Sequence, residues 1–226
     1  MISGRDACAC TFYRTIILEW CCQMIQTAYL MSFTTGGLFY GESIKVAELY
    51  LDVRDWQKVK VQVLAGNLLQ SRTSSSAARV YREISSRISL LTDDQLQFLA
   101  GATRKEQNYL LWLAVCKRYV FIREFAIEVL REKFLCLEST LSHDDYDSFY
   151  HQKALWHEEL DNLSLSTRKK NRSVLFRILL EAELLSADKL IVPALFTRKL
   201  AALIAADNPS FFSCYPIADR DIKELL

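Results

Sequence analysis

Apolar residues recur along most of the chain at the three- and four-residue spacing of an amphipathic helix. The clearest case runs from Ser166 to Leu185. At about 100° per residue, one arc of this helix is apolar and the opposite arc is cationic. The apolar arc holds Val174, Leu175, Ile178, Leu179, Ala182 and Leu185, and the cationic arc holds Lys169, Lys170, Arg172 and Arg177. The pattern predicts a helix with one face in a core and cations on the other.

The start of this helix concentrates positive charge. Five Lys or Arg residues and no acid lie between Ser166 and Arg177. We expect Ser166 or Thr167 to cap the helix, because a short hydroxyl can accept from a free backbone N–H of the first turn. The cations that follow would oppose the helix dipole. A helix with cations in its first turns is expected to have an anionic partner. More commonly, however, a run of charged residues simply forms a solvated basic face.

A short strand is predicted after the helix, where Lys189–Val192 contains β-branched residues and ends at Pro193. A helix followed by a short β wing is the order found at the end of winged-helix DNA-binding units. The cations would face phosphates, with Asn171 and the two hydroxyl residues as neutral contacts. The candidate nucleic-acid contacts on this helix are Ser166, Thr167, Arg168, Lys169, Lys170 and Arg172.

A similar unit is predicted upstream. Asp55 can cap a helix that stops near Gly66, and the polar turn 68–76 supplies N-caps for a second helix. Helix, short turn and Ser-capped helix with an arginine face is the order of a helix-turn-helix. Three packed helices with ordinary surface arginines explain this stretch equally well. The candidate contacts here are Arg72, Ser75, Arg79 and Arg82.

Composition favours an all-α fold. The 226 residues include only 6 Gly and 3 Pro, and 51% of residues are hydrophobic. So few turn-formers favour long helices with short connections, and we expect a compact multi-helix globule. The apolar run around Trp112 predicts a core helix. We expect three parts: an N-terminal extension (1–30) separate from the native fold, a helical region with the first unit (31–135), and a helical region with the basic winged-helix-like unit (136–226).

The net charge of +1 indicates no particular partner, but the distribution of charges along the chain is more informative. Seven acids and one Lys between Glu138 and Leu163 precede the basic helix, and such segregation can conceal an anion-binding patch. Seven cysteines, without framework spacing, indicate free thiols in a reducing cytosol. No apolar run reaches the roughly 20 residues of a membrane span. We therefore expect a cytoplasmic protein.

Three histidines in the acidic segment, His143, His151 and His157, raise the hypothesis of a metal site. His151 and His157 would point to different sides of a helix, and the acids fit a helix N-terminus. No nucleophile–base pair or carboxylate pair has the spacing that catalysis needs. We therefore expect no catalytic residue, no metal, no cofactor and no enzymatic activity.

The order of several stretches resembles one known family. The stretches are Phe33–Leu38 with Glu42-Ser43, Asn67–Gln70 leading into Ser74–Arg87, Lys117–Tyr119 with Phe125 and Glu128–Arg131, and Ser166–Lys169 with Phe176–Leu179. Together they resemble BrxA, the small all-helical component of BREX (bacteriophage exclusion) defence systems, from about Met31 to near Leu200. Order and spacing carry the resemblance rather than any single motif. Glu183 stands where relatives often have Gly.

The resemblance implies a non-enzymatic cytoplasmic protein with helix-turn-helix elements that binds duplex DNA. It would act beside a DNA methyltransferase, a phosphatase-like protein, an ATPase and other BREX components. We therefore expect a DNA-binding accessory component of antiviral defence that contacts double-stranded DNA mainly through the phosphate backbone. The alternatives are a protein-interaction scaffold within the BREX complex and an RNA binder like NusB, to which the family has been likened.

Overall fold

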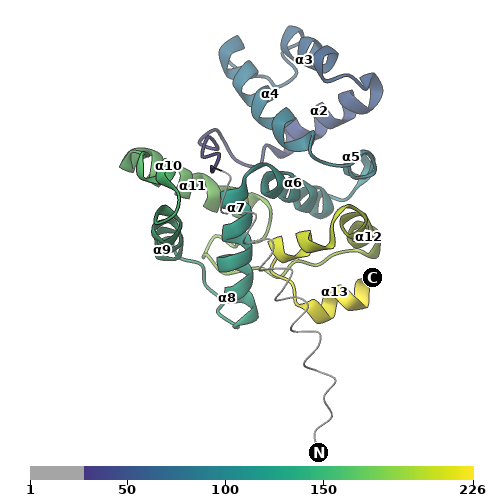
Figure 1. The fold of residues 1–226 in the computed structure, drawn as a ribbon. Helices are drawn as coiled ribbons and strands as arrows, with labels where there is room; N and C mark the ends of the chain where they lie inside the picture. Colours follow the sequence, from purple (N-terminus) through teal and green to yellow (C-terminus); the bar gives the residue numbers. More distant parts are fainter. Residues whose placement is uncertain (1–27) are drawn as a thin grey trace, which may run out of the picture.

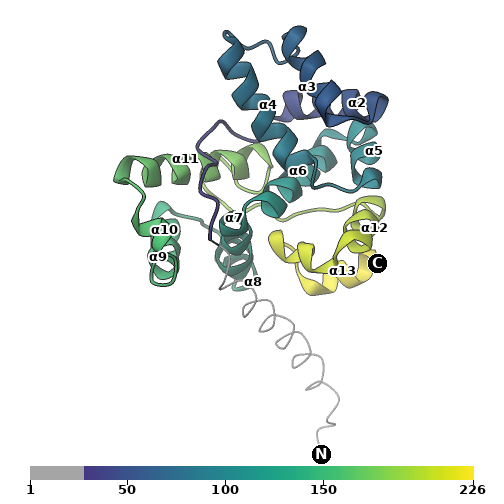
Figure 2. The same ribbon diagram turned by 45° about the horizontal axis from the view of Figure 1, so that its top comes forward.

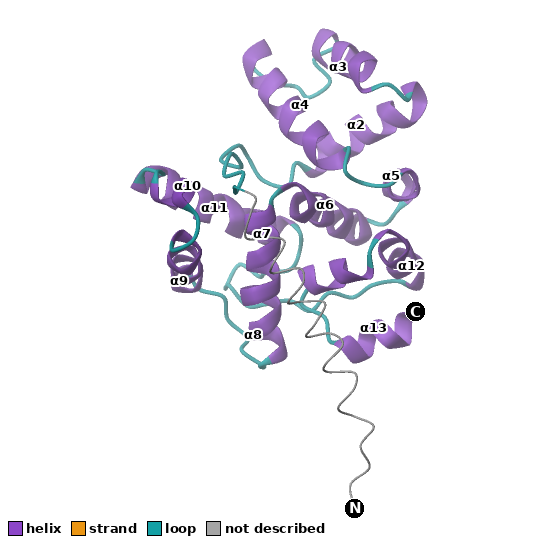
Figure 3. Ribbon diagram, in the orientation of Figure 1, coloured by secondary structure: helices purple, strands orange, loops and turns teal. Residues whose placement is uncertain are grey.

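The computed structural model describes residues 28–226, so most of the predicted extension lies outside the described residues. The regular structure of the described part consists of helices (Figures 1 and 3). Two isolated β-bridges also occur there. In order, the elements are α2 (Tyr40–Val53), α3 (Trp56–Ala65), α4 (Ser74–Ile88), α5 (Asp93–Gly101), α6 (Arg104–Arg118), α7 (Val120–Phe125), the π-helix η1 (Ala126–Arg131), α8 (Glu132–Leu135), α9 (His143–Ala154), α10 (Glu158–Asp161), α11 (Leu165–Glu181), α12 (Arg198–Asp207), the 3₁₀ helix η2 (Pro209–Cys214) and α13 (Asp219–Leu225). The all-α prediction is confirmed.

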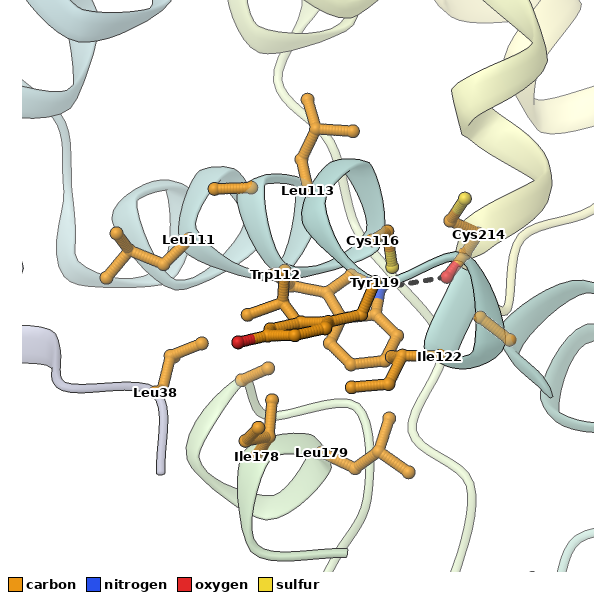
Figure 4. Close-up of a cluster of buried hydrophobic side chains, with 14 of the residues drawn as sticks. Leu38, Leu111, Trp112, Leu113, Cys116, Tyr119, Ile122, Ile178, Leu179 and Cys214 are labelled. Carbon is orange, nitrogen blue, oxygen red and sulfur yellow. Dashed lines mark hydrogen bonds between the residues drawn. The ribbon is translucent and has the colours of Figure 1, made fainter. Parts of the chain in front are cut away.

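Helix α6 is the core helix that its sequence predicts. Its ten consecutive residues Gln107–Cys116 are buried, so every face of this stretch meets other elements. The indole N–H of Trp112 donates to the Cys214 carbonyl oxygen at 2.9 Å. Figure 4 shows Trp112 packed beside Ile178 and Leu179 of α11, with Cys214 of η2 on the other side. Segments far apart in the sequence therefore meet on α6.

The two predicted DNA-binding units occupy separate parts of the molecule. Helices α3 and α4 form one end, helices α9, α10 and α11 lie on another side, and α6 and α7 lie between them (Figures 1 and 2). Helices α12 and α13 form a third group beside the C-terminus. The two units therefore lie on different sides of one core.

In the first unit, α3 is followed by a short connection and then by α4. The Asp55 carboxylate caps α3 by accepting the N–H groups of Gln57 and Lys58. Thr73 caps α4, with its hydroxyl accepting from the Ser76 N–H, so the expectation that a serine caps this helix is wrong. The apolar face of α4 is buried, including Tyr81 and Ile84.

The basic helix α11 begins two residues earlier than the predicted caps allow. Ser164 is the N-cap, and its hydroxyl accepts from the Thr167 N–H at 3.2 Å. The expectation that Ser166 or Thr167 caps the helix is therefore wrong. Both residues lie in the first turn instead, and each hydroxyl is 2.9 Å from the Ser164 hydroxyl. Because Arg168 now falls in the second turn, the cations oppose the helix dipole less than the sequence suggests.

The predicted wing at residues 189–192 is paired but forms no strand. Leu190 bridges Thr140, and Ile191 bridges Leu185, both antiparallel. The Ile191 N–H donates to the Ser139 carbonyl at 2.7 Å, and the Val192 N–H to the Leu184 carbonyl at 3.0 Å. Lys189, with a φ of 60°, lies in the turn between Leu185 and Ile191. Pro193, which has no backbone N–H to donate, directly follows Val192. The pairing is therefore too short to become a ladder.

The segment that leads into α2 is part of the core. Met31, Phe33 and Leu38 are buried, and so is Tyr29, which lies before the predicted boundary at Met31. The Tyr29 hydroxyl donates to the Glu124 carboxylate at 2.5 Å. The packed structure thus includes Tyr29.

Candidate nucleic-acid interface

Helix α11 presents a continuous basic stripe to solvent. Residues three or four positions apart are neighbours on one helix face. Five exposed polar residues on this face, Ser166, Lys169, Lys170, Ser173 and Arg177, are called the α11 stripe, and the exposed Leu180 lies on the same face. The stripe contains no acid. Within residues 28–226, its three cations form no ion pair. These side chains are therefore available to an anionic ligand.

The other two cations of the same helix are used inside the protein. Arg172 forms an ion pair with Asp147 of α9. The Arg168 guanidinium lies over the Tyr150 ring, 4.2 Å from its centroid, and its Nη2 is 2.8 Å from Nε2 of His151. These contacts fasten α9 to α11. The predicted set of four cations is thus divided between an exposed pair and an internal pair.

The inner face of α11 is anchored by the N-terminal segment. Asn171, predicted as a DNA contact, is fully buried, and its amide donates to the Met31 carbonyl at 3.3 Å. The Glu181 carboxylate accepts the N–H of Leu38. The acid at the end of α11 is therefore engaged by backbone and sits outside the stripe. Asn171 is structural and cannot reach a ligand while the helix remains packed.

The position of α9, and with it the Asp147 carboxylate, depends on a capping box. The Ser142 hydroxyl accepts from the Asp145 N–H, and the Ser142 N–H donates to the Asp145 carboxylate. Burial would raise the pKa of Asp145, but hydrogen bonds from Lys133 and Ser142 outweigh it and hold that pKa below the ordinary 3.8. The carboxylate is thus charged when it caps the helix.

His143 joins α9 to α11 by an apolar contact. Its ring meets Phe176 edge-on, with centroids 4.7 Å apart. Burial, followed by the nearby charges of Lys189 and Arg172, lowers the pKa of His143 below the ordinary 6.5. The neutral imidazole is therefore the form that this interface favours.

Helix α4 and the segment before it carry the second group of predicted contacts, with Arg72 in that segment. Arg72, Ser75, Arg79 and Arg82 are all exposed. Within residues 28–226 the three arginines form no ion pair. The fourth arginine of this region, Arg87, is buried and pairs with Glu83 at 2.6 Å, which keeps the acid away from the exposed face.

Two residues of the stripe, Ser173 and Arg177, were absent from the predicted contacts. Arg177 lies on the cationic arc of the sequence pattern, so helical periodicity alone could have included it. Helical periodicity could not have predicted the pairing of Arg172 with Asp147, because Asp147 lies 25 residues away on another helix.

Residues 28–226 contain no group of three or more His, Cys, Asp and Glu side chains that could hold a metal ion. In the same part of the chain, no helix is long and apolar enough to cross a membrane. The described cysteines, Cys116, Cys136 and Cys214, are free, and the second is exposed. The remaining four cysteines, with their predicted free thiols, lie outside the described residues.

The fold and surface together define an all-α protein with a buried central helix and basic stripes on two surface helices. The BrxA family model matches residues 27–208. Because this match covers most of the chain, the protein belongs to the BrxA family.

Two relatives named "BREX protein BrxA" are similar to the chain. The one from Escherichia coli O9:H4 (strain HS) is 25% identical over 155 residues, covering 69% of this chain and 73% of the relative. The one from Bacillus cereus (strain H3081.97) is 25% identical over 132 residues, covering 58% and 66%. A crystal structure of an uncharacterized protein from Magnetospirillum magneticum has a TM-score of 0.69 at 18% identity, covering 83% of this chain and 98% of that one. That likeness concerns the fold alone.

Proposed function

We propose that this protein is a DNA-binding, non-enzymatic component of a BREX defence system. Family membership and the relatives' names support the BREX assignment. The α11 stripe is the observation that carries DNA binding. It offers Lys169, Lys170 and Arg177 to solvent on a helix whose opposite face is fixed in the core.

The arrangement around α11 supports a duplex rather than a single-stranded ligand. Two isolated bridges lie beside α11: Leu185 pairs with Ile191 after the helix, and Leu190 pairs with Thr140, which precedes the helix in the sequence. A helix whose inner face is fixed in the core suits the regular phosphate spacing of a duplex. The stripe itself has no aromatic residue on which an unstacked base could lie.

The side-chain chemistry of the stripe favours phosphate contacts over base recognition. Lys169 and Lys170 are flexible point charges, and Ser166 and Ser173 are short hydroxyls. Such groups commonly position a protein on the DNA backbone, and the stripe contains no Asn or Gln that could pair with the edge of an adenine. The exposed arginines of α4 would supply a second, separate contact.

The proposal is tested by duplex-DNA affinity as a function of salt. A Lys169→Ala/Lys170→Ala/Arg177→Ala variant should flatten the log–log salt slope by about 2.7, at roughly 0.9 for each phosphate that the protein no longer neutralises. An Arg72→Ala/Arg79→Ala/Arg82→Ala variant is the matched test of α4. Wild-type protein that binds no duplex even at low salt contradicts the proposal. Tighter binding of single-stranded RNA than of duplex DNA in competition also contradicts it.

A protein-interaction scaffold remains the second candidate, because one observation favours it. Leu155, Trp156 and Leu165 expose 77%, 78% and 71% of their surface. All three lie in a stretch that runs from the end of α9 to the first residue of α11. Large apolar groups gathered in one exposed segment are typical of a protein contact.

A further inference from the structure

The segment from Leu155 to Leu165, which we call the corner, presents large apolar side chains to solvent. It joins the end of α9, the short helix α10 and the first residue of α11 (Figures 1 and 2). Leu155, Trp156 and Leu165 expose most of their surface, whereas Trp112 in the core is fully buried. Large apolar groups that stay exposed in one short segment are typical of a contact with another molecule.

The backbone of the corner is held from beneath. The buried His157 ring stacks on Tyr29 with centroids 3.9 Å apart, and its Nδ1 lies 3.0 Å from the Glu159 carboxylate. The same carboxylate accepts the backbone N–H of Tyr29. Because His157 is held inward, the neighbouring Trp156 is presented outward on a fixed support. A preformed surface of this kind loses little entropy when a partner binds.

Three helices meet around the Tyr150 ring beside the corner. The Tyr150 hydroxyl donates to the Leu160 carbonyl, which ties α10 to α9. The Arg168 guanidinium of α11 lies over the same ring, 4.2 Å from its centroid. The last turns of α9 and the first turns of α11 are therefore held together. The exposed apolar side chains of the corner thus lie in one region of the surface.

The exposed charges of the corner are negative. No Lys or Arg lies between Ala154 and Thr167. Glu158 and Asp161 are exposed, and neither forms an ion pair within residues 28–226. Carboxylates beside apolar groups repel phosphate, so the corner suits neither a nucleic acid nor an anionic membrane. They attract a cationic surface instead.

We propose that the corner docks a cationic segment of a different protein, one that also carries large apolar side chains. The apolar side chains of the partner cover Leu155 and Trp156, while its Lys or Arg side chains face Glu158 and Asp161. Tryptophan anchors carry much of the energy of protein contacts, and the surrounding charges set specificity. The inference deepens the scaffold role, the second candidate function, by giving it a partner of defined chemistry. It does not depend on DNA binding.

The probe is a synthetic helical peptide of about 18 residues, a length at which an isolated helix can form, with Leu on one face and Lys on the other. Isothermal titration calorimetry with the full chain, without DNA, measures its affinity at low and high salt. The peptide should bind, and its binding should weaken as salt screens the charges. A control peptide with Glu in place of every Lys should bind about tenfold more weakly or less, because like charges then meet.

Changes at Trp156 test the apolar part of the contact. Trp156→Ser should weaken peptide binding about tenfold or more. Leu137→Ser, at an exposed leucine outside the corner, should have no effect. The tryptophan emission of the wild type should shift to the blue as the peptide covers Trp156. Trp156→Phe, which keeps an aromatic anchor, should retain binding but lose this shift.

Changes at the two carboxylates test the charge. Glu158→Gln/Asp161→Asn should weaken binding about threefold or more at low salt and remove most of its salt dependence. The matched control, Glu48→Gln/Asp52→Asn, removes two exposed acids of α2 and should change neither quantity. Circular dichroism checks that each variant is folded.

The outcomes are separable from those of the DNA experiment. A protein that binds duplex DNA but not the lysine peptide overturns this inference and leaves DNA binding standing. Equal losses from the corner variants and their controls also overturn it, because the peptide then binds elsewhere. Dimers in sedimentation velocity that Trp156→Ser dissociates would assign the corner to a second copy and overturn it too. Peptide binding that requires Trp156 and the two carboxylates supports it, whether or not the protein binds DNA.

Discussion

Helices α4 and α11 look alike in sequence but differ in how the fold uses their cations. Each has a hydroxyl cap, a buried apolar face and several Lys or Arg residues. On α4, Arg79 and Arg82 are exposed while the buried Arg87 holds the helix to the core. On α11, α9 takes up Arg168 and Arg172. The cations of a basic run therefore stay exposed only where no neighbouring helix offers an acid or a ring.

Replacing Arg87 should have the largest effect, because its charge is buried. The guanidinium pairs with Glu83 and donates to the Gly37 carbonyl at 2.8 Å. Arg87→Ala leaves both groups without this partner in the interior, and we expect a loss of about 3 kcal/mol of unfolding free energy. Urea denaturation measures it. Arg82→Ala, one turn away and exposed, is the control and should stay within about 0.5 kcal/mol. Similar losses from both would contradict the distinction between buried and exposed cations on α4.

Breaking the contact between α9 and α11 should cost less. Arg172 and Asp147 expose 20% and 40% of their side chains, so solvent screens their attraction. A double-mutant cycle of Arg172→Ala and Asp147→Ala should give a coupling free energy of about 0.5–1 kcal/mol. A coupling near zero would mean that this pair does not fasten the two helices.

Acid should weaken the α9–α11 contact by a smaller amount still. The folded protein lowers the pKa of His143 below 6.5, so the unfolded chain takes up the proton first. The stability from neutral His143 is fully present above pH 6.5 and is lost as pH falls through the folded pKa. Thermal denaturation of the wild type should therefore depend more on pH below 6.5 than that of His143→Gln. Equal pH dependence would show that His143 makes no such contribution.

The exposed stripe should contribute almost nothing to folding. Lys169→Ala/Lys170→Ala removes two exposed charges that touch no acid in the described part of the chain, so unfolding free energy should change by less than about 0.5 kcal/mol. Denaturation midpoints measured beside those of Arg172→Ala would show this contrast. A larger loss would place the two lysines in the structural group with Arg168 and Arg172.

The sequence predicted the features of the fold that depend on local pattern. Helical periodicity found the α6 core around Trp112, the Asp55 cap and the two-sided character of α4 and α11. Helical periodicity could not predict the features that depend on residues far away in the sequence. The burial of Asn171 requires the Met31 carbonyl, and the pairing of Arg172 requires Asp147. The observed N-cap of α11 is Ser164 rather than the predicted Ser166 or Thr167. Several adjacent hydroxyls can serve as a cap, and the direction of the incoming chain selects one of them.

The most direct test compares the two halves of the α11 basic cluster in duplex-DNA binding. Lys169→Ala/Lys170→Ala and Arg168→Ala/Arg172→Ala remove the same charge from the same helix. If the exposed stripe binds phosphate, the lysine variant should flatten the log–log salt slope by about 1.8, at roughly 0.9 for each phosphate. The arginine variant should flatten it much less while lowering stability more. An equal or larger change of slope in the arginine variant would contradict the assignment of the stripe.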